Sequence, residues 1–264
     1  MALDTVQYVL GAGSGGLVGF TLGLIGGGGS VLAVPLLVYL VRVPNPHIAI
    51  GTSALAVAAN AIISLASHAR AKTVIWQCGG VYAAAGIVGA LAGSTLGKAI
   101  DGQKLLFLFA LLMLLIGVIM LRGRGNSGVE GATCNRENAP KVLSFGFGTG
   151  LFSGFFGIGG GFLIVPGLIA STRMPMLNAV GTSLVAVTAF GLTTALNYAF
   201  SGMVDWGLAA MLIGGGFIGS IAGAATARRL AGDRGMLATI FVGVVFIVAF
   251  YMLWRSGGAL FNAI

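Results

Sequence analysis

The sequence predicts an all-α polytopic membrane protein built from two homologous repeats, which we expect to be inverted relative to one another. Each repeat should contain a glycine-broken pair of segments, re-entrant or half-helical, followed by three transmembrane helices. Apolar residues make up 57% of the 264 residues and charged residues only 8%, with a mean hydropathy of +1.02. That leaves too little polar surface to cover a water-facing body. Two glycine-rich stretches also interrupt apolar sequence, and the residues around them recur in the same order.

The charge pattern agrees with a membrane protein. The net charge of +8 comes from basic residues that stand singly or in small groups between apolar runs. Such residues are typical of membrane flanks, so we do not expect nucleic acid as a partner. The length allows roughly eight to ten apolar segments of about 20 residues each. Because Met1–Gln7 has no basic residue, the first apolar segment is not expected to be a cleaved signal peptide.

Repeat 1 is expected to comprise residues 1–121. Its first apolar segment, Tyr8–Ile25, leads into a glycine cluster. The next segment, Val31–Val41, is too short to cross a bilayer as a straight helix, and the prolines that follow it predict a turn. Three longer segments predict transmembrane helices, namely Ile48–Ala66, Val74–Leu96 and Leu105–Leu121.

Residues 122–141 form a polar stretch that we interpret as a flexible linker between the halves. Repeat 2, residues 142–264, then follows the same plan. Its apolar segments are Val142–Phe156, Phe162–Ala170, Leu177–Phe200, Trp206–Ala227 and Met236–Trp254. Gly51 aligns with Gly181 and Trp76 with Trp206, at an offset of about 130 residues, and repeats of this kind are common in transporters.

The basic residues also predict an orientation. If the linker faces the cytoplasm and each glycine-broken pair turns back, then Arg70, Lys72 and the group Arg228, Arg229 and Arg234 face the cytoplasm too. This satisfies the positive-inside tendency and makes the halves inverted. If each broken pair crossed the membrane once, the group at Arg228 would face outward.

Each glycine break predicts a binding site for a small anion. A helix that begins after the break presents unpaired N–H groups and the positive end of its dipole. The predicted cradle consists of Gly28, Gly29, Ser30, Gly159, Gly160 and Gly161. The alternative is close helix packing, which small residues permit; this explains the glycines spaced four apart at Gly89, Gly93 and Gly97 and at Gly215, Gly219 and Gly223.

Four hydroxyls follow the breaks, on Thr52, Ser53, Thr182 and Ser183. They can donate to an anion or bond to the backbone of their own helix, and the sequence leaves both roles open. Asn60 and Asn197, within apolar segments, are expected mainly to join helices.

Other chemistry is not expected. Cys78 lies in an apolar segment and Cys134 in the linker, so we expect neither a disulfide nor a metal site. His47 and His68 stand at segment ends, where an interfacial side chain is the ordinary explanation. No catalytic motif is recognisable, and we expect neither an enzyme nor a cofactor.

The glycine breaks resemble those of the TauE/SafE family of sulfite exporters and anion permeases. The resemblance rests on Gly157–Gly161 through Pro166, on Ala179–Leu184 and on Val204–Trp206, with looser matches around Gly26–Pro35 and Ala49–Ser53. It implies transport of small sulfur-containing anions such as sulfite, sulfoacetate or other organosulfonates. The family usually has Asp-Trp where this chain has Ile75-Trp76, so Asp205 is expected to be a structural cap.

The leading hypothesis is therefore a secondary transporter that moves a small anion across the bacterial cytoplasmic membrane by alternating access. The alternatives are a passive anion channel, a transporter of a different small solute, and a non-transporting membrane scaffold. The expected partners are the anionic substrate and the lipid bilayer, and a second copy of the chain is a further candidate.

Overall fold

The computed structural model describes residues 4–122, 134, 138–159, 161–229, 243 and 245–255. These residues are helical apart from short connections. The first half contains α1 (Thr5–Ile25), a 3₁₀ helix (Gly26–Leu32), α2 (Ala33–Pro35), a π-helical turn (Leu36–Leu40), α3 (Pro46–Arg70), α4 (Trp76–Ala99) and α5 (Gly102–Arg122). The second half contains α6 (Ala139–Phe156), α7 (Gly161–Thr172), α8 (Met176–Phe200), α9 (Trp206–Arg229) and the C-terminal helix Val245–Arg255.

Four of these helices, α3, α4, α8 and α9, are long and apolar enough to cross a membrane. The predicted segments correspond to the observed helices within a few residues. The beginning of the predicted segment Met236–Trp254 lies outside the described residues.

Both glycine-broken pairs double back. The side chain of Gln7, at the start of α1, donates to the carbonyl of Val41 at 3.0 Å. The beginning and the end of the first pair therefore lie side by side. In the second pair α6 packs against α7, and Lys141 near the start of α6 lies beside Ser171 near the end of α7. We call these pairs the first hairpin (residues 5–41) and the second hairpin (residues 139–173).

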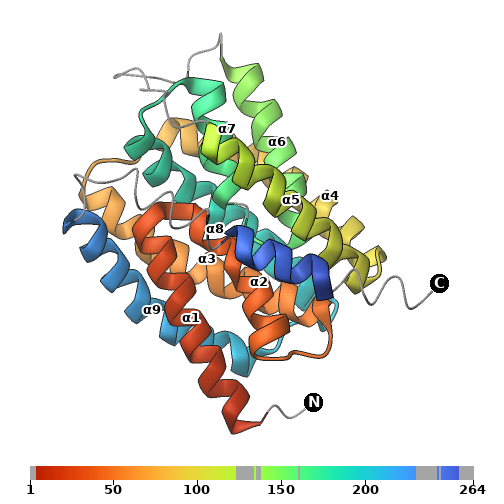
Figure 1. The fold of residues 1–264 in the computed structure, drawn as a ribbon. Helices are drawn as coiled ribbons and strands as arrows, with labels where there is room; N and C mark the ends of the chain where they lie inside the picture. Colours follow the sequence, from red (N-terminus) through yellow and green to blue (C-terminus); the bar gives the residue numbers. More distant parts are fainter. Residues whose placement is uncertain are drawn as a thin grey trace.

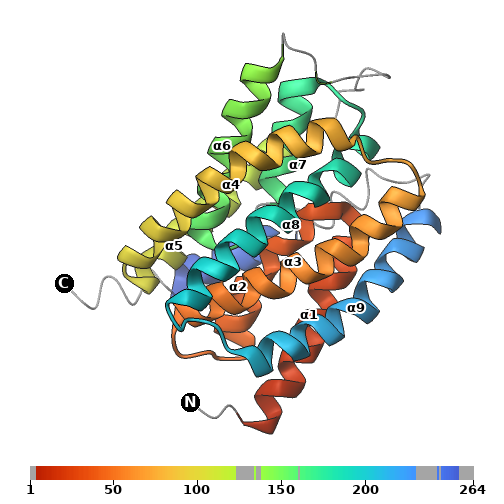
Figure 2. The same cartoon turned by 180° about the vertical axis from the view of Figure 1, so that it is seen from behind.

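The centre of the molecule is the antiparallel pair α3 and α8, which both views show side by side (Figures 1 and 2). The long arms of the hairpins pack outside this pair, α1 against α9 and α6 against α4. Each long arm therefore lies against a helix from the other half of the chain. This exchange joins the two halves over most of their length.

Glycines permit the close approach of these outer helices. A Cβ at Gly93 of α4 would collide with the carbonyl of Leu151 on α6, and one at Gly219 of α9 would collide with the carbonyl of Gly16 on α1. The packing role predicted for the glycines spaced four apart is thus confirmed. Between lipid-embedded helices, such contacts provide the van der Waals attraction that apolar burial cannot supply.

The prediction that the cysteines remain unpaired is wrong. Cys78 and Cys134 form a disulfide, with an S–S distance of 2.02 Å. The residues looked unlike in sequence because one lies in an apolar helix and the other in a polar connection. The fold brings the first turn of α4 to the linker, where the Gln77 side chain also donates to the Cys134 carbonyl at 3.4 Å.

Candidate functional site

The turn of the second hairpin, residues 157–161, is built around two left-handed glycines. Gly157 (φ 66°) ends α6 and its N–H bonds to the carbonyl of Ser153, and Gly159 (φ 64°) follows two residues later. Residues with a Cβ rarely adopt this conformation. Since α7 begins at Gly161, the amino end of a 12-residue helix points into the turn. Gly160 lies outside the described residues.

This turn is seated on the central helix pair. A Cβ at Gly157 would collide with Ile50 of α3, and one at Gly159 would lie 2.7 Å from Val57 of α3 and 3.5 Å from Val187 of α8. Ile158 between them is fully buried. The turn thus occupies the place where α3 and α8 meet, and it has no room for a larger side chain.

Two serine hydroxyls lie close to the turn. Ser53 Oγ donates to the carbonyl of Ile50 at 2.9 Å and lies 3.4 Å from the carbonyl oxygen of Gly157. Ser153, on the last turn of α6, is completely buried, and its hydroxyl has no hydrogen-bond partner within the described part of the chain. An unpaired hydroxyl in a dry interior is costly, so Ser153 is a polar group available to a bound molecule. Ser153 is not among the site residues predicted from the sequence.

The first break is constructed differently. Gly26–Leu32 continues from α1 as a 3₁₀ helix, and the chain folds back so that Gly29 lies against the backbone of Thr21 and Leu22. The Thr21 hydroxyl lies 3.4 Å from the Gly29 carbonyl. Gly28, Gly29 and Ser30 therefore belong to a helical segment, which packs against α7 and α8. The two breaks meet at the centre of the molecule, but only the second has left-handed glycines among the described residues.

The predicted threonines join helices from opposite halves. Thr52 Oγ1 on α3 accepts from the N–H of Asp205 just before α9, at 3.0 Å. Thr182 Oγ1 on α8 accepts from the N–H of Ile75 just before α4, also at 3.0 Å. These equivalent bonds cap the amino ends of the outer helices. Ser183, which follows Thr182 on α8, donates its hydroxyl to the carbonyl of Val180 in its own helix at 2.7 Å.

Asp205 is a helix cap, as predicted. Its Oδ1 accepts from the N–H of Leu208 in the first turn of α9, at 2.9 Å. Asn197 is also confirmed as a residue that joins helices. It donates to Ser94 and Thr95 of α4 at 2.6 and 3.1 Å, and its side-chain oxygen accepts from Lys98 at 2.8 Å.

Asn60 differs from Asn197. It is buried against Gly216 of α9, and its Oδ1 has no partner among the described residues. Ser64 of α3 and Thr194 of α8 are likewise buried with unpaired hydroxyls, and they stand at equivalent positions in the two halves. The central helices therefore carry several polar groups that their own packing leaves unsatisfied.

The histidines lie near helix ends. His68 Nδ1 is 2.9 Å from Thr73 Oγ1 in the connection to α4. His47 lies in the first turn of α3, and its ring centroid is 6.3 Å from that of Tyr198. Among the described residues, the contacts of the two histidines do not include the glycine turn.

Comparison with known proteins agrees with this architecture. Residues 11–252 match the family described as "Sulfite exporter TauE/SafE". The chain belongs to the TauE/SafE family. It is a multi-pass membrane transporter rather than an enzyme, as predicted.

The relatives of this TauE/SafE chain carry general names. A "Probable membrane transporter protein" of Xylella fastidiosa is 50% identical, covering 97% of this chain and 99% of its own. The probable membrane transporter protein YunE of Bacillus subtilis is 29% identical, over 81% and 87% of the two chains. A third, from Methanocaldococcus jannaschii, is 28% identical over 63% and 64%. No solved structure matches the chain.

Proposed function

We propose that this protein is a secondary transporter that moves a small sulfur-containing anion, such as sulfite, sulfoacetate or another organosulfonate, by alternating access. The observation that carries the proposal is the turn of the second hairpin. There the amino end of α7 and the buried Ser153 hydroxyl, which has no partner among the described residues, lie at the meeting point of α3 and α8. A helix amino end attracts anions, and a hydroxyl donates to anionic oxygens.

We place the anion cradle at Gly28, Gly29, Ser30, Gly159, Gly160 and Gly161, with Ser53 and Ser153 beside the second turn. Thr52, Thr182 and Ser183 are assigned as flanking hydroxyls, of which the two threonines also hold the outer helices. The family description names sulfite, whereas the relatives are named only as membrane transporters. The sulfur anion is therefore the part of the proposal that most needs a direct test.

Inversion of the two repeats, residues 1–121 and 142–264, is part of the proposal. Three equivalences support it: the hydrogen bonds of Thr52 and Thr182, the packing of α1 on α9 and α6 on α4, and the left-handed residues at matching positions. The last group pairs Arg42 (φ 60°) with Arg173 (φ 57°) and Lys72 (φ 54°) with Gly202 (φ 69°). Two similar halves in opposite orientations can exchange conformations, which is the basis of alternating access.

The test is transport by the purified protein in liposomes. Sulfite, thiosulfate, sulfoacetate, taurine, acetate and chloride would be compared at matched ionic strength, with and without proton or sodium gradients. Gradient-driven accumulation of a sulfur oxyanion or sulfonate is expected. Absence of uptake for every sulfur anion would refute the substrate class. Gradient-independent flux above about 10⁴ ions per second, well beyond typical turnover rates, would instead indicate the channel alternative.

A further inference from the structure

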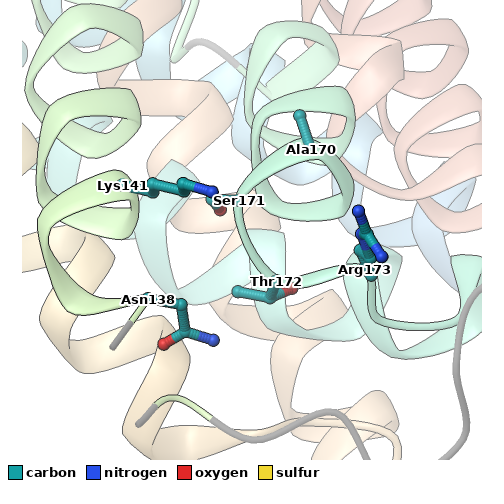
Figure 3. Close-up of a pocket in the computed structure, with 6 residues that line it drawn as sticks. All are labelled: Asn138, Lys141, Ala170, Ser171, Thr172 and Arg173. Atoms are coloured by element: carbon teal, nitrogen blue, oxygen red, sulfur yellow. The ribbon is translucent and has the colours of Figure 1, made fainter. Parts of the chain in front are cut away.

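A polar pocket lies at the open end of the second hairpin, away from the glycine turn. It has a volume of about 440 Å³ and is lined by Asn138, Lys141, Ala170, Ser171, Thr172 and Arg173. Lys141 extends from α6 toward Ser171 on α7, and Arg173 lies just beyond the end of α7 (Figure 3). The pocket and the glycine turn are thus at opposite ends of α7, about 18 Å apart along a 12-residue helix.

Among the residues that the structure describes, no acid pairs with the two cations of the pocket. Neither Lys141 nor Arg173 forms an ion pair with any residue whose position the structure gives. The hydroxyls of Ser171 and Thr172 donate to carbonyls of their own helix, at 2.8 and 2.7 Å. The groups that the pocket offers to an anion are therefore its two cationic side chains, because both hydroxyls are engaged within α7.

The described charges next to the pocket are also basic. Among the residues whose side chains the structure describes, Arg70, Lys72, Lys141 and Arg173 lie at the helix ends or connections around the pocket. The described acidic residues, Asp4, Asp101 and Asp205, all lie at the opposite face. A concave site that is lined by two cations concentrates anions.

We propose that this pocket is a loading site, where Lys141 and Arg173 capture the small oxyanion or sulfonate before it reaches the glycine turn. The inference rests on the proposed transport function and adds to it a second, outer anion site. A purely structural role is the competing explanation, because cations near the end of α7 would also stabilise its dipole. If the pocket is a loading site, removing its cations should lower the anion affinity. If the cations are purely structural, removing them should lower the stability of the fold.

The backbone offers a matched set of variants. Arg173→Gly removes the charge at a left-handed position that glycine adopts readily, so the fold should be retained. Lys72→Gly makes the same change on the same face outside the pocket, and Arg42→Gly makes it on the opposite face; both residues are also left-handed. Lys141→Gln with Lys141→Arg as its rescue completes the set.

The experiment measures sodium sulfite binding by calorimetry on the purified full-length chain, and the KM and maximal rate of sulfite transport in liposomes. We expect Arg173→Gly and Lys141→Gln each to weaken binding and raise KM about tenfold, as for loss of one charge-assisted contact. The maximal rate and the melting temperature should stay near those of the unmodified protein. For Lys141→Arg, Lys72→Gly and Arg42→Gly, the sulfite affinity and KM should stay within about twofold of the values of the unmodified protein.

Equal effects of Lys72→Gly and Arg173→Gly would assign the effect to general surface charge and overturn the loading site. Unchanged KM and binding in Arg173→Gly and Lys141→Gln would overturn it as well, as would a loss of melting temperature without a loss of affinity. If sulfite binds the unmodified protein, is lost in these variants and yet is never transported, the pocket remains an anion site and the transport function is what fails.

Discussion

Gly159 shows how a single residue ties the backbone to the site. Its left-handed conformation and its contacts with Val57 and Val187 both exclude a side chain. Gly202, in the connection between α8 and α9, has the same conformation (φ 69°) but open space around its Cα. Substitutions at Gly159 and Gly202 therefore allow the free-energy cost of the left-handed backbone to be distinguished from the cost of steric crowding.

We predict that Gly159→Ala abolishes transport, whereas Gly202→Ala leaves it intact. Each substitution should cost about 1–2 kcal/mol for the left-handed conformation, and only Gly159→Ala should add a steric penalty. The measurement is transport together with thermal unfolding. Adding Val57→Ala to Gly159→Ala should restore part of the loss by making room for the new methyl group. Equal behaviour of the two alanine variants would show that packing of the turn does not matter.

Thr182 raises a different question at the same scale, namely whether its hydroxyl holds a helix or binds the substrate. Because Thr182→Val leaves the N–H of Ile75 without its acceptor, we predict a loss of about 1–3 kcal/mol in unfolding free energy, and Thr182→Ser should restore most of it. Thermal unfolding and transport would be compared in both variants. Lost transport at unchanged stability would mean that the hydroxyl acts on the substrate instead.

At the scale of helices, the sequence predicted which segments exist and where they end, because long apolar runs bounded by charges and prolines leave few alternatives. It also predicted the packing role of the glycines spaced four apart. It could not predict that the first break is a 3₁₀ helix and the second a left-handed turn. Both are glycine clusters followed by apolar residues, and only the contact of Gly29 with α1 and of Gly159 with α3 distinguishes them.

The hydroxyls of the candidate site show the same limit. Their position after the turns was evident, but Thr52 and Thr182 reach partners more than 100 residues away, and such pairings depend on tertiary contacts. Ser153 could not be predicted because a serine in a glycine-rich helix is unremarkable until the fold shows that it is buried without a partner among the described residues. The disulfide was missed for the related reason that only the fold brings Cys134 to the first turn of α4.

The α4–α6 contact yields a prediction about an element. Gly93→Ala places a methyl group against the Leu151 carbonyl, whereas Gly80→Ala, on the same helix, has nothing within 4 Å of the new Cβ. We predict that Gly93→Ala separates the helices and lowers the melting temperature clearly, while Gly80→Ala is neutral or slightly stabilising because alanine favours helix by up to about 1 kcal/mol. Detergent-purified variants would be compared by thermal unfolding and size-exclusion chromatography. Similar stability of both variants would contradict close packing at this contact.

For the whole molecule, charge predicts the orientation in the membrane. The described helix ends and connections on the face of Lys141 and Arg173 carry basic residues, so we propose that this face is cytoplasmic. The Cys78–Cys134 pair lies on the same face. Since the cytosol keeps most thiols reduced, the pair should be exposed to the cell's reducing systems.

We therefore predict that Cys78 and Cys134 are mainly dithiols in unstressed cells and form the disulfide when the cells are treated with a thiol oxidant. Alkylation of free thiols before and after reduction, followed by mass spectrometry, measures the two forms, with Cys134→Ser as the control. A disulfide that is complete in unstressed cells would instead place this face outside the cytoplasm and reverse the proposed orientation.

The bridge between Cys78 and Cys134, 56 positions apart, also closes a covalent ring that contains most of α4 and all of α5. The ring can close only after Cys134 has left the ribosome, when every helix of the first half has already been synthesised. Once it is closed, two covalent routes connect Cys78 to Cys134. A protease that cuts between α5 and Cys134 would then leave one molecule, which separates into two fragments only when the bridge is reduced.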